Sequence, residues 1–215
     1  MKTLYESLCE SLCEDFFDNV GGSSFNLIDN WCKDNIEGKY EIDRETLTIN
    51  SSSDIKIINR NLTEFPSYIH FGTVKGNFIC DDCTSLTSLK GAPIEVGRNF
   101  YCINCTSLKT LEGAPEKVGR DFSCNNCHLL KSLEGAPKKV GFGFYCINCT
   151  SLKTLEGAPR KVGWNFSCGN CTSLKSLKGA PKRVGMDFYC TDCPSLKSLE
   201  GAPTYVKGEI YSDIK

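Results

Sequence analysis

Residues 100–105 read Phe100-Tyr-Cys-Ile-Asn-Cys105, and the pattern Phe-x-Cys-x-x-Cys that they contain recurs every 22 residues. Each copy is followed by Leu-x-x-Leu-x-Gly-Ala-Pro-x-x-Val. The six copies begin at Phe78, Phe100, Phe122, Phe144, Phe166 and Phe188. Near-identical units of this length predict a solenoid, in which each coil buries its apolar side chains against the neighbouring coils.

The alternation of side chains along a strand places Phe and the first Cys of each copy on one face. We expect this face to point into the core, joined there by the second Cys, both Leu and the Val. The predicted fold class is therefore a β-solenoid of the leucine-rich-repeat-like kind. It has 22-residue coils, one parallel sheet of about eight strands and a short α-helical N-terminal cap.

The remainder of the chain is expected to close the ends of the stack. Apolar residues spaced four apart in residues 3–18 indicate an amphipathic helix, and Ser24 is suited to cap a second helix that runs to about Ile36. Ser212 replaces the first Cys in a final strand whose charges disfavour further pairing. The predicted parts are a helical cap (1–39), degenerate capping coils (40–75), six repeats (76–208) and a C-terminal capping strand (209–215).

The unit also resembles known repeats. Val-x-x-x-Phe-x-Cys-x-x-Cys-x-x-Leu resembles the leucine-rich repeat, with one extra residue after Val and one after the second Cys. Its tail is similar to Leu/Pro-rich repeats of secreted bacterial effectors, and Cys-Thr-Ser-Leu, as at Cys105, to repeats of certain bacterial surface proteins. The chain most resembles tailed-phage proteins with Cys-x-Asn-Asn-x-Leu-Thr-Ser-Leu-x-Gly-Ala-Pro units. This resemblance covers residues 40–208 and implies a phage- or bacteria-encoded binding scaffold.

Charge is distributed unevenly along a chain whose net charge is only -1. Residues 1–75 carry seven Lys or Arg against thirteen Asp or Glu, whereas residues 76–208 carry seventeen against eleven. The first residues contain several acids and lack the apolar core of a secretion signal, and no apolar run is long enough to cross a bilayer. We therefore expect a cytoplasmic protein (host cytoplasm if phage-encoded) that is not secreted and does not bind membranes.

The fifteen cysteines admit three interpretations. The first is a ladder of reduced, buried thiols that fill small core positions, as expected in a reducing compartment. The second is zinc, because Cys80-x2-Cys83-x18-Cys102-x2-Cys105 fits a zinc-site spacing. The third is a set of disulfides. Because any 22-residue repeat that contains Cys-x-x-Cys produces the zinc spacing automatically, the thiol ladder is favoured, and we expect no cofactor.

The strand positions that alternate with the inward Phe and Cys are expected to form a binding face. Tyrosine occupies this face in every second coil, and the position just before the strands carries two large aromatics that would extend it at one rim. Tyr and Trp often dominate binding energy. The predicted partner-binding residues are Tyr101, Ile103, Phe142, Tyr145, Ile147, Trp164 and Tyr189.

This face leads to the predicted function, a non-enzymatic scaffold that binds a protein partner. The chain contains no glycine-rich phosphate loop and no nucleophile paired with a base, so we do not expect an enzyme. The alternatives are a zinc-binding Cys-x-x-Cys array and polyanion or nucleic-acid binding through basic pairs at the Pro-x-x-Val corners, such as Arg160-Lys161. Nucleic acid is the less expected partner, because glutamates recur three residues after another lysine row.

Overall fold

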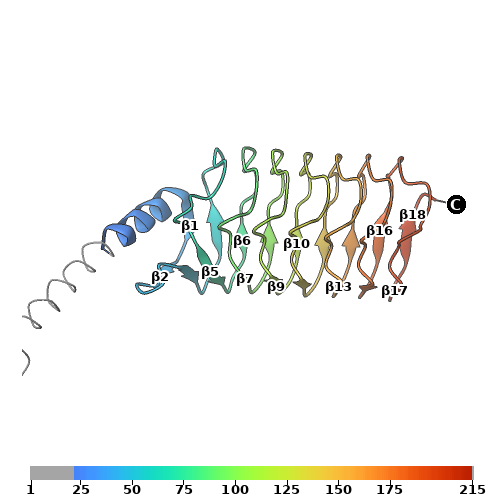
Figure 1. The fold of residues 1–215 in the computed structure, drawn as a ribbon. Helices are drawn as coiled ribbons and strands as arrows, with labels where there is room; N and C mark the ends of the chain where they lie inside the picture. The colour runs from blue at the N-terminus through green and yellow to red at the C-terminus, as the bar shows by residue number, and fades with distance from the viewer. Residues whose placement is uncertain (1–21, 215) are drawn as a thin grey trace, which may run out of the picture.

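The computed structural model describes residues 22–214, which form one helix followed by a β-solenoid (Figure 1). The helix spans residues 22–35 and lies at the N-terminal end of the stack. It corresponds to the helix predicted from Ser24, whereas the helix predicted over residues 3–18 lies outside the described residues. The predicted β-solenoid of 22-residue coils is confirmed.

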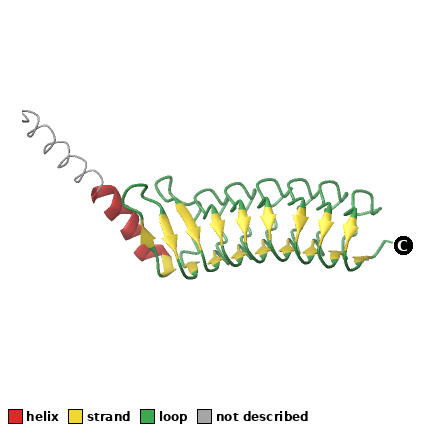
Figure 2. Cartoon of the chain, turned by 90° about the horizontal axis from the view of Figure 1, so that it is seen from below, coloured by secondary structure: helices red, strands yellow, loops and turns green. Residues whose placement is uncertain are grey.

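Two nine-stranded sheets run along the solenoid, where the sequence predicts one (Figure 2). The first sheet contains, in order, β1 (Ile36–Gly38), β4 (Ile55–Ile57), β6 (Phe78–Ile79), β8 (Phe100–Tyr101), β10 (Phe122–Ser123), β12 (Phe144–Tyr145), β14 (Phe166–Ser167), β16 (Phe188–Cys190) and β18 (Ile210–Ser212). The second contains β2 (Glu41–Ile42), β3 (Ile49–Ser51), β5 (Phe71–Val74), β7 (Glu95–Val96), β9 (Lys117–Val118), β11 (Lys139–Val140), β13 (Lys161–Val162), β15 (Arg183–Val184) and β17 (Tyr205–Val206).

The second sheet arises from the repeat itself. Each Val lies opposite the Val of the neighbouring coil, as Val140 does to Val162, just as Phe122 lies opposite Phe100 in the first sheet. The repeat pairings are parallel and in register. The antiparallel pairings among the described strands, β1 with β4 and β2 with β3, close the N-terminal end, where β1 and β2 are the outermost strands.

The core is a set of columns that run the length of the stack. The six Phe rings have 0% exposure and stack coil upon coil with centroids 5.1–5.5 Å apart and interplanar angles of 8–23°. In the first five copies both Cys, both Leu and the Val are also buried at 0–5% exposure, which confirms the predicted inward set for these copies. In the sixth copy the second Leu, Leu199, is 36% exposed, because the next coil is not completed over it.

The turn after each first-sheet strand depends on a column of Asn and Asp residues. Their φ angles lie between 56° and 60° in Asn104, Asn148 and Asn170, a left-handed conformation that Asn and Asp tolerate better than most residues. The amides also bond along the column, with Asn126 Nδ2 donating to Asn104 Oδ1 at 2.7 Å and Asn148 Nδ2 donating to Asn126 Oδ1 at 2.8 Å. This asparagine row therefore has a structural role that explains its recurrence.

Candidate functional site

The tyrosines of the predicted binding face are half-buried, so the exposed strip expected along the first sheet is only partly formed. Tyr101 and Tyr145 lie in register on either side of Ser123, whose exposure is only 3%. Ile103, Ile147 and Tyr189 are half-buried as well. The small Ser123 between two large rings is itself buried. The face is therefore flatter and less accessible than alternation along a single strand predicts.

Tyr145 owes its position to the residue beneath it. In the neighbouring coils, the position two residues before the outward strand residue carries Asn or Asp. The coil of Tyr145 has Gly143 at this position. A Cβ on Gly143 would overlap the Tyr145 ring, so the missing side chain leaves the space that this ring fills. Burial, and then the nearby Asp121 carboxylate, raise the pKa of the Tyr145 phenol. In the coil of Tyr189, by contrast, Asp187 is present and its Oδ2 accepts a hydrogen bond from the phenol at 3.1 Å.

Phe142 and Trp164 are the exposed members of the predicted set. Their exposed fractions are 51% and 46%, and they occupy the same position in adjacent coils, where Trp164 N donates to Phe142 O at 2.9 Å. We call this pair the aromatic column. It lies in the link between the two sheets, at the position that Arg98 and Arg120 hold in earlier coils. The chain thus replaces a charged position by a large exposed aromatic in two consecutive coils.

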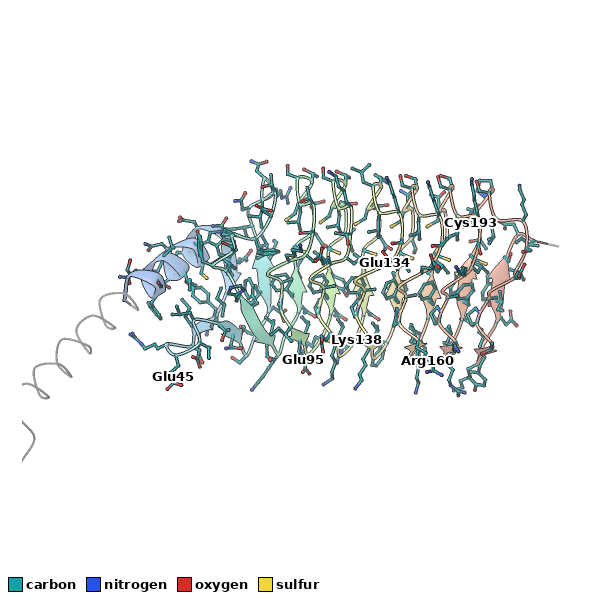
Figure 3. The ribbon with its side chains drawn as sticks, in the orientation of Figure 1. Glu45, Glu95, Glu134, Lys138, Arg160 and Cys193 are labelled. Carbon is teal, nitrogen blue, oxygen red and sulfur yellow. The ribbon has the colours of Figure 1, made fainter. Side chains whose placement is uncertain are left out.

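A second surface feature follows the corners that lead into the second sheet. We call it the basic ridge, and it consists of Lys138, Lys139, Arg160, Lys161, Lys182 and Arg183. All six side chains are exposed. Lys138 and Arg160 lie along the same edge of the solenoid as Glu95, whereas Glu134 lies away from them (Figure 3). In the ion pairs formed between described residues, Lys138 bonds Glu116 at 2.8 Å, and the other five have no carboxylate partner.

The other lysine row is not neutralised in the way the sequence predicts. The row consists of Lys109, Lys131, Lys153, Lys175 and Lys197, and the glutamates three residues later were expected to neutralise part of its charge. Instead, Glu112 pairs with Lys90 at 3.1 Å and Glu156 with Lys178 at 2.8 Å. These partners occupy the same position as the glutamates in neighbouring coils, because residues 22 apart are the nearest neighbours in the stack.

The cysteines form two columns of buried free thiols with opposite hydrogen-bond directions. Strand thiols donate toward the C-terminal end of the stack, as Cys102 Sγ does to Ser123 O at 3.4 Å. Turn thiols donate toward the other end, as Cys127 Sγ does to Cys102 O at 3.3 Å. The thirteen cysteines among the described residues are all buried and free, and these residues contain no cluster of three or more potential metal ligands.

The environment of the thiols disfavours their ionised form. A sulfur hydrogen bond with the turn Cys of the next coil, and then burial, raise the pKa of Cys80, Cys102 and Cys124 well above the ordinary value. Burial raises the pKa of Cys83 to about 12 and that of Cys193 to about 11. Because the thiolate is the species that attacks electrophiles and binds metals, these thiols are held in an unreactive form.

This chemistry gives a first prediction. In a variant with Cys9→Ser and Cys13→Ser, which removes the two cysteines outside the described residues, a thiol reagent at pH 7 should label no cysteine of the native protein. It should label thirteen after unfolding without reductant. Fewer than thirteen would indicate disulfides, and stoichiometric zinc in elemental analysis of the native protein would contradict the ladder of protonated thiols.

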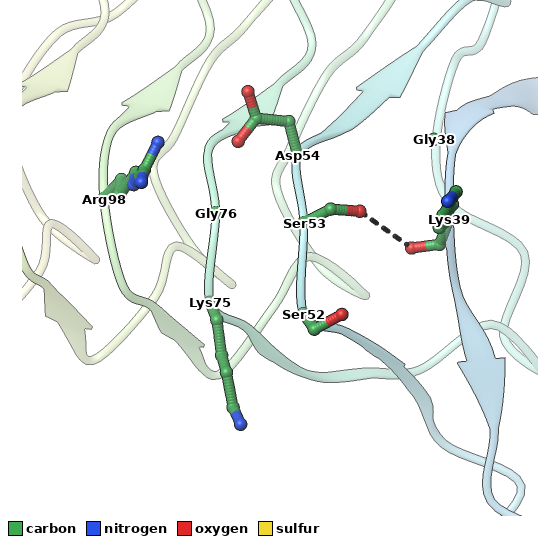
Figure 4. A pocket seen from close by; sticks show the side chains of 8 residues that line it. All are labelled: Gly38, Lys39, Ser52, Ser53, Asp54, Lys75, Gly76 and Arg98. Carbon is green, nitrogen blue, oxygen red and sulfur yellow. Dashed lines mark hydrogen bonds between the residues drawn. The ribbon is translucent and has the colours of Figure 1, made fainter.

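A hollow of about 750 Å³ lies where the N-terminal strands meet the first coil (Figure 4). Arg98, Lys75 and Lys39 border it, but Lys75 points away from Arg98 and Asp54. The Asp54 carboxylate is already bonded to Asn77, accepting from its backbone N at 2.8 Å and from Nδ2 at 2.9 Å. The charged groups therefore do not converge on a common point, and the hollow is the weaker candidate site.

No family model, curated protein or solved structure matches the chain. Residues 22–214 contain no helix with the length and apolar character needed to span a bilayer. The aromatic column and the basic ridge are surface features that recur at the same position in consecutive coils.

Proposed function

We propose that the protein is a binding scaffold that holds a protein partner on the link between its two sheets, centred on the aromatic column. The observation that carries this proposal is the exposure of Phe142 and Trp164 in adjacent coils. Large apolar side chains that lie next to one another on the surface are in unfavourable contact with water, and a partner that covers them gains free energy. Trp is also among the residues that most often dominate binding energy at interfaces.

The rigidity of the stack supports this proposal. The backbone of each coil bonds the next through both sheets, and the link itself is bonded by Phe142 N to Arg120 O and Met186 N to Trp164 O. The two aromatic side chains are thus presented on a fixed backbone, and binding does not require an ordering of the chain. Preorganised surfaces bind more tightly for the same contact area. The half-buried Tyr145 and Ile147 would form the border of such an interface rather than its centre.

The test replaces the aromatic column while leaving the core untouched. Phe142→Ser combined with Trp164→Ser should keep the far-ultraviolet spectrum and the unfolding midpoint, because both side chains are about half exposed. Affinity capture from a lysate of the native host, followed by mass spectrometry, should recover a partner with the unmodified protein. Titration calorimetry with that purified partner should then show an affinity at least about tenfold weaker for the variant.

A matched control uses Leu129, which is 45% exposed in the turn that follows β10. Leu129→Ser removes a comparable exposed apolar side chain far along the coil from the aromatic column. This variant should retain the partner. Equal loss of binding in the Leu129 variant and the aromatic variant, or retention in both, would show that the aromatic column is not the binding site.

A further inference from the structure

We infer that the aromatic column and the basic ridge form one composite site for an acidic, extended segment of a protein partner. This inference rests on the proposed function and adds to it the chemistry of the partner. It combines the basic ridge, which spans three coils, with the aromatic column, which occupies two of these coils.

The coils that carry the aromatic column are almost free of acid. Residues 135–186 contain nine Lys or Arg and a single acidic residue, Glu156, which is paired with Lys178 at 2.8 Å. Five cations of the basic ridge have no carboxylate partner among the described residues: Lys139, Arg160, Lys161, Lys182 and Arg183. Lys161 lies directly opposite Arg183 in neighbouring strands. Like charges at this spacing repel one another unless an anion lies between or above them.

A strip of glycine backbone separates the cations from the aromatics. In each coil one Gly lies in the sequence between the strand Val and the aromatic position. Gly141 directly precedes Phe142, and Gly163 directly precedes Trp164. A Cβ on Gly163 would overlap the carbonyl oxygen of Gly141, because the coils approach closely here. No side chain can therefore fill the strip. A groove of about 490 Å³ lies on the cation side of this strip. Its lining consists of the glycines at 119, 141 and 163, the valines at 118 and 140, and the lysines at 117, 138, 139 and 161, and does not include Phe142 or Trp164.

This geometry matches an extended peptide with alternating character. Successive side chains of an extended chain point to opposite sides, about 3.3 Å apart along the chain. Carboxylates on one side would meet the basic ridge while apolar side chains on the other side meet Phe142 and Trp164. The bare glycine strip lets the peptide backbone approach closely between them.

The limited length of the site favours a protein segment over nucleic acid. Toward the N-terminal end, Glu116 and Glu95 occupy the same corner positions. Glu116 is paired with Lys138, and Glu95 is paired with Lys117. Toward the C-terminal end they become Thr204 and Tyr205. The unpaired cations thus span three coils, or roughly 10 Å at a strand spacing of about 4.8 Å. A long polyanion that followed the ridge would run onto acidic side chains, whereas a short acidic segment would end before them.

The test measures fluorescence anisotropy with two labelled probes, a ten-residue peptide that alternates Glu with Leu and Phe, and a twelve-nucleotide oligothymidine. The unmodified protein should bind the acidic peptide at about 50 mM salt and lose most of that binding at about 300 mM. Lys139→Glu with Lys161→Glu should weaken binding at least about tenfold. The control, Lys153→Glu with Lys175→Glu, makes the same change of charge on the other lysine row and should change binding less than about twofold.

Each alternative outcome contradicts the inference. Tighter binding of oligothymidine than of the peptide would assign the site to nucleic acid, and equal loss in both charge variants would indicate a general effect of net charge. Absence of peptide binding would also overturn the inference. The proposed function is tested separately. If the captured partner is lost on replacing Phe142 and Trp164 but is retained by the Lys139 and Lys161 variant, the proposed scaffold function stands and only the acidic partner is excluded.

Discussion

Raising the pH from 8 to 10 should unfold this protein cooperatively, even though it contains no buried salt bridge among its described residues. The cause is the number of protonated thiols in the core. Eleven cysteines have a raised pKa in the folded state: Cys32, Cys80, Cys83, Cys102, Cys124, Cys127, Cys146, Cys168, Cys171, Cys190 and Cys193. Burial is the main raising influence for most of them. In Cys127 a hydrogen bond with Cys102 is the largest single influence and lowers the pKa, but burial and the neighbouring thiols together raise it above the ordinary value.

The sign of the effect follows from where the protons are bound. In the unfolded chain a thiol releases its proton near pH 8.5, whereas in the folded state it keeps the proton at that pH. The stabilisation is therefore fully present below about pH 8.5 and is lost as the pH rises toward the folded-state pKa. Above the unfolded-state pKa, each thiol that stays protonated in the folded state favours unfolding, and the contributions of the eleven act in the same direction. Because a typical domain is only marginally stable, several such contributions are enough to unfold it.

The measurement is far-ultraviolet circular dichroism after overnight incubation at pH values from 7 to 11, with a phosphine reductant present to prevent oxidation. The midpoint should fall above about pH 8.5, where the thiols of the unfolded chain release their protons. A variant with Cys124→Ala and Cys146→Ala releases two fewer protons on unfolding, so its free energy of unfolding should fall less steeply with pH. A sheet signal that persists unchanged at pH 11, or an equal slope in the variant, would show that thiol ionisation does not govern the transition.

The inward-facing positions could be predicted from the sequence because the stack repeats them. Phe122 meets Phe100 and Phe144 rather than an unrelated element, so a pattern observed in one coil determines the contacts of the next. The second sheet was missed for a physical reason. In the first sheet the buried Phe and first Cys lie on either side of an outward residue, whereas a second-sheet strand such as Lys139–Val140 buries a single Val between exposed residues, which leaves no alternation to detect. Their pairing is a property of the stack rather than of a local pattern.

The accessibility of the candidate site could be predicted only in part. Tyr145 was expected to be exposed by alternation, but its ring fills the space left by Gly143 and lies beside the small Ser123 of the preceding coil. Phe142 shares the parity of the inward-facing Phe144, yet it is exposed because the chain bends between the two sheets. A bend changes which side a residue faces, and parity along a strand does not report it. The resemblance to phage and leucine-rich repeats remains a prediction.

Because this bend buries Phe144 and exposes Phe142, the two residues together provide a test of the core. Phe144→Ala should destabilise the protein by about 4 kcal/mol, the usual cost of removing a fully buried aromatic ring. Phe144 has 0% exposure, and its ring stacks on Phe122 at 5.1 Å and on Phe166 at 5.2 Å. The cavity would interrupt the continuous Phe column at its centre, and both neighbouring rings would lose a stacking partner, which adds to the loss of buried area.

The matched control is the same substitution two residues earlier. Phe142→Ala removes an identical side chain that is 51% exposed, and it should change the free energy of unfolding by less than about 0.5 kcal/mol. Urea unfolding monitored by circular dichroism measures both variants. The difference between them isolates burial, because residue type, strand neighbourhood and coil are shared. Similar losses of stability in the two variants would mean that the aromatic column also supports the fold. The exposed position of Phe142 and Trp164 would then have a structural explanation, and the proposed binding role would lose its main support.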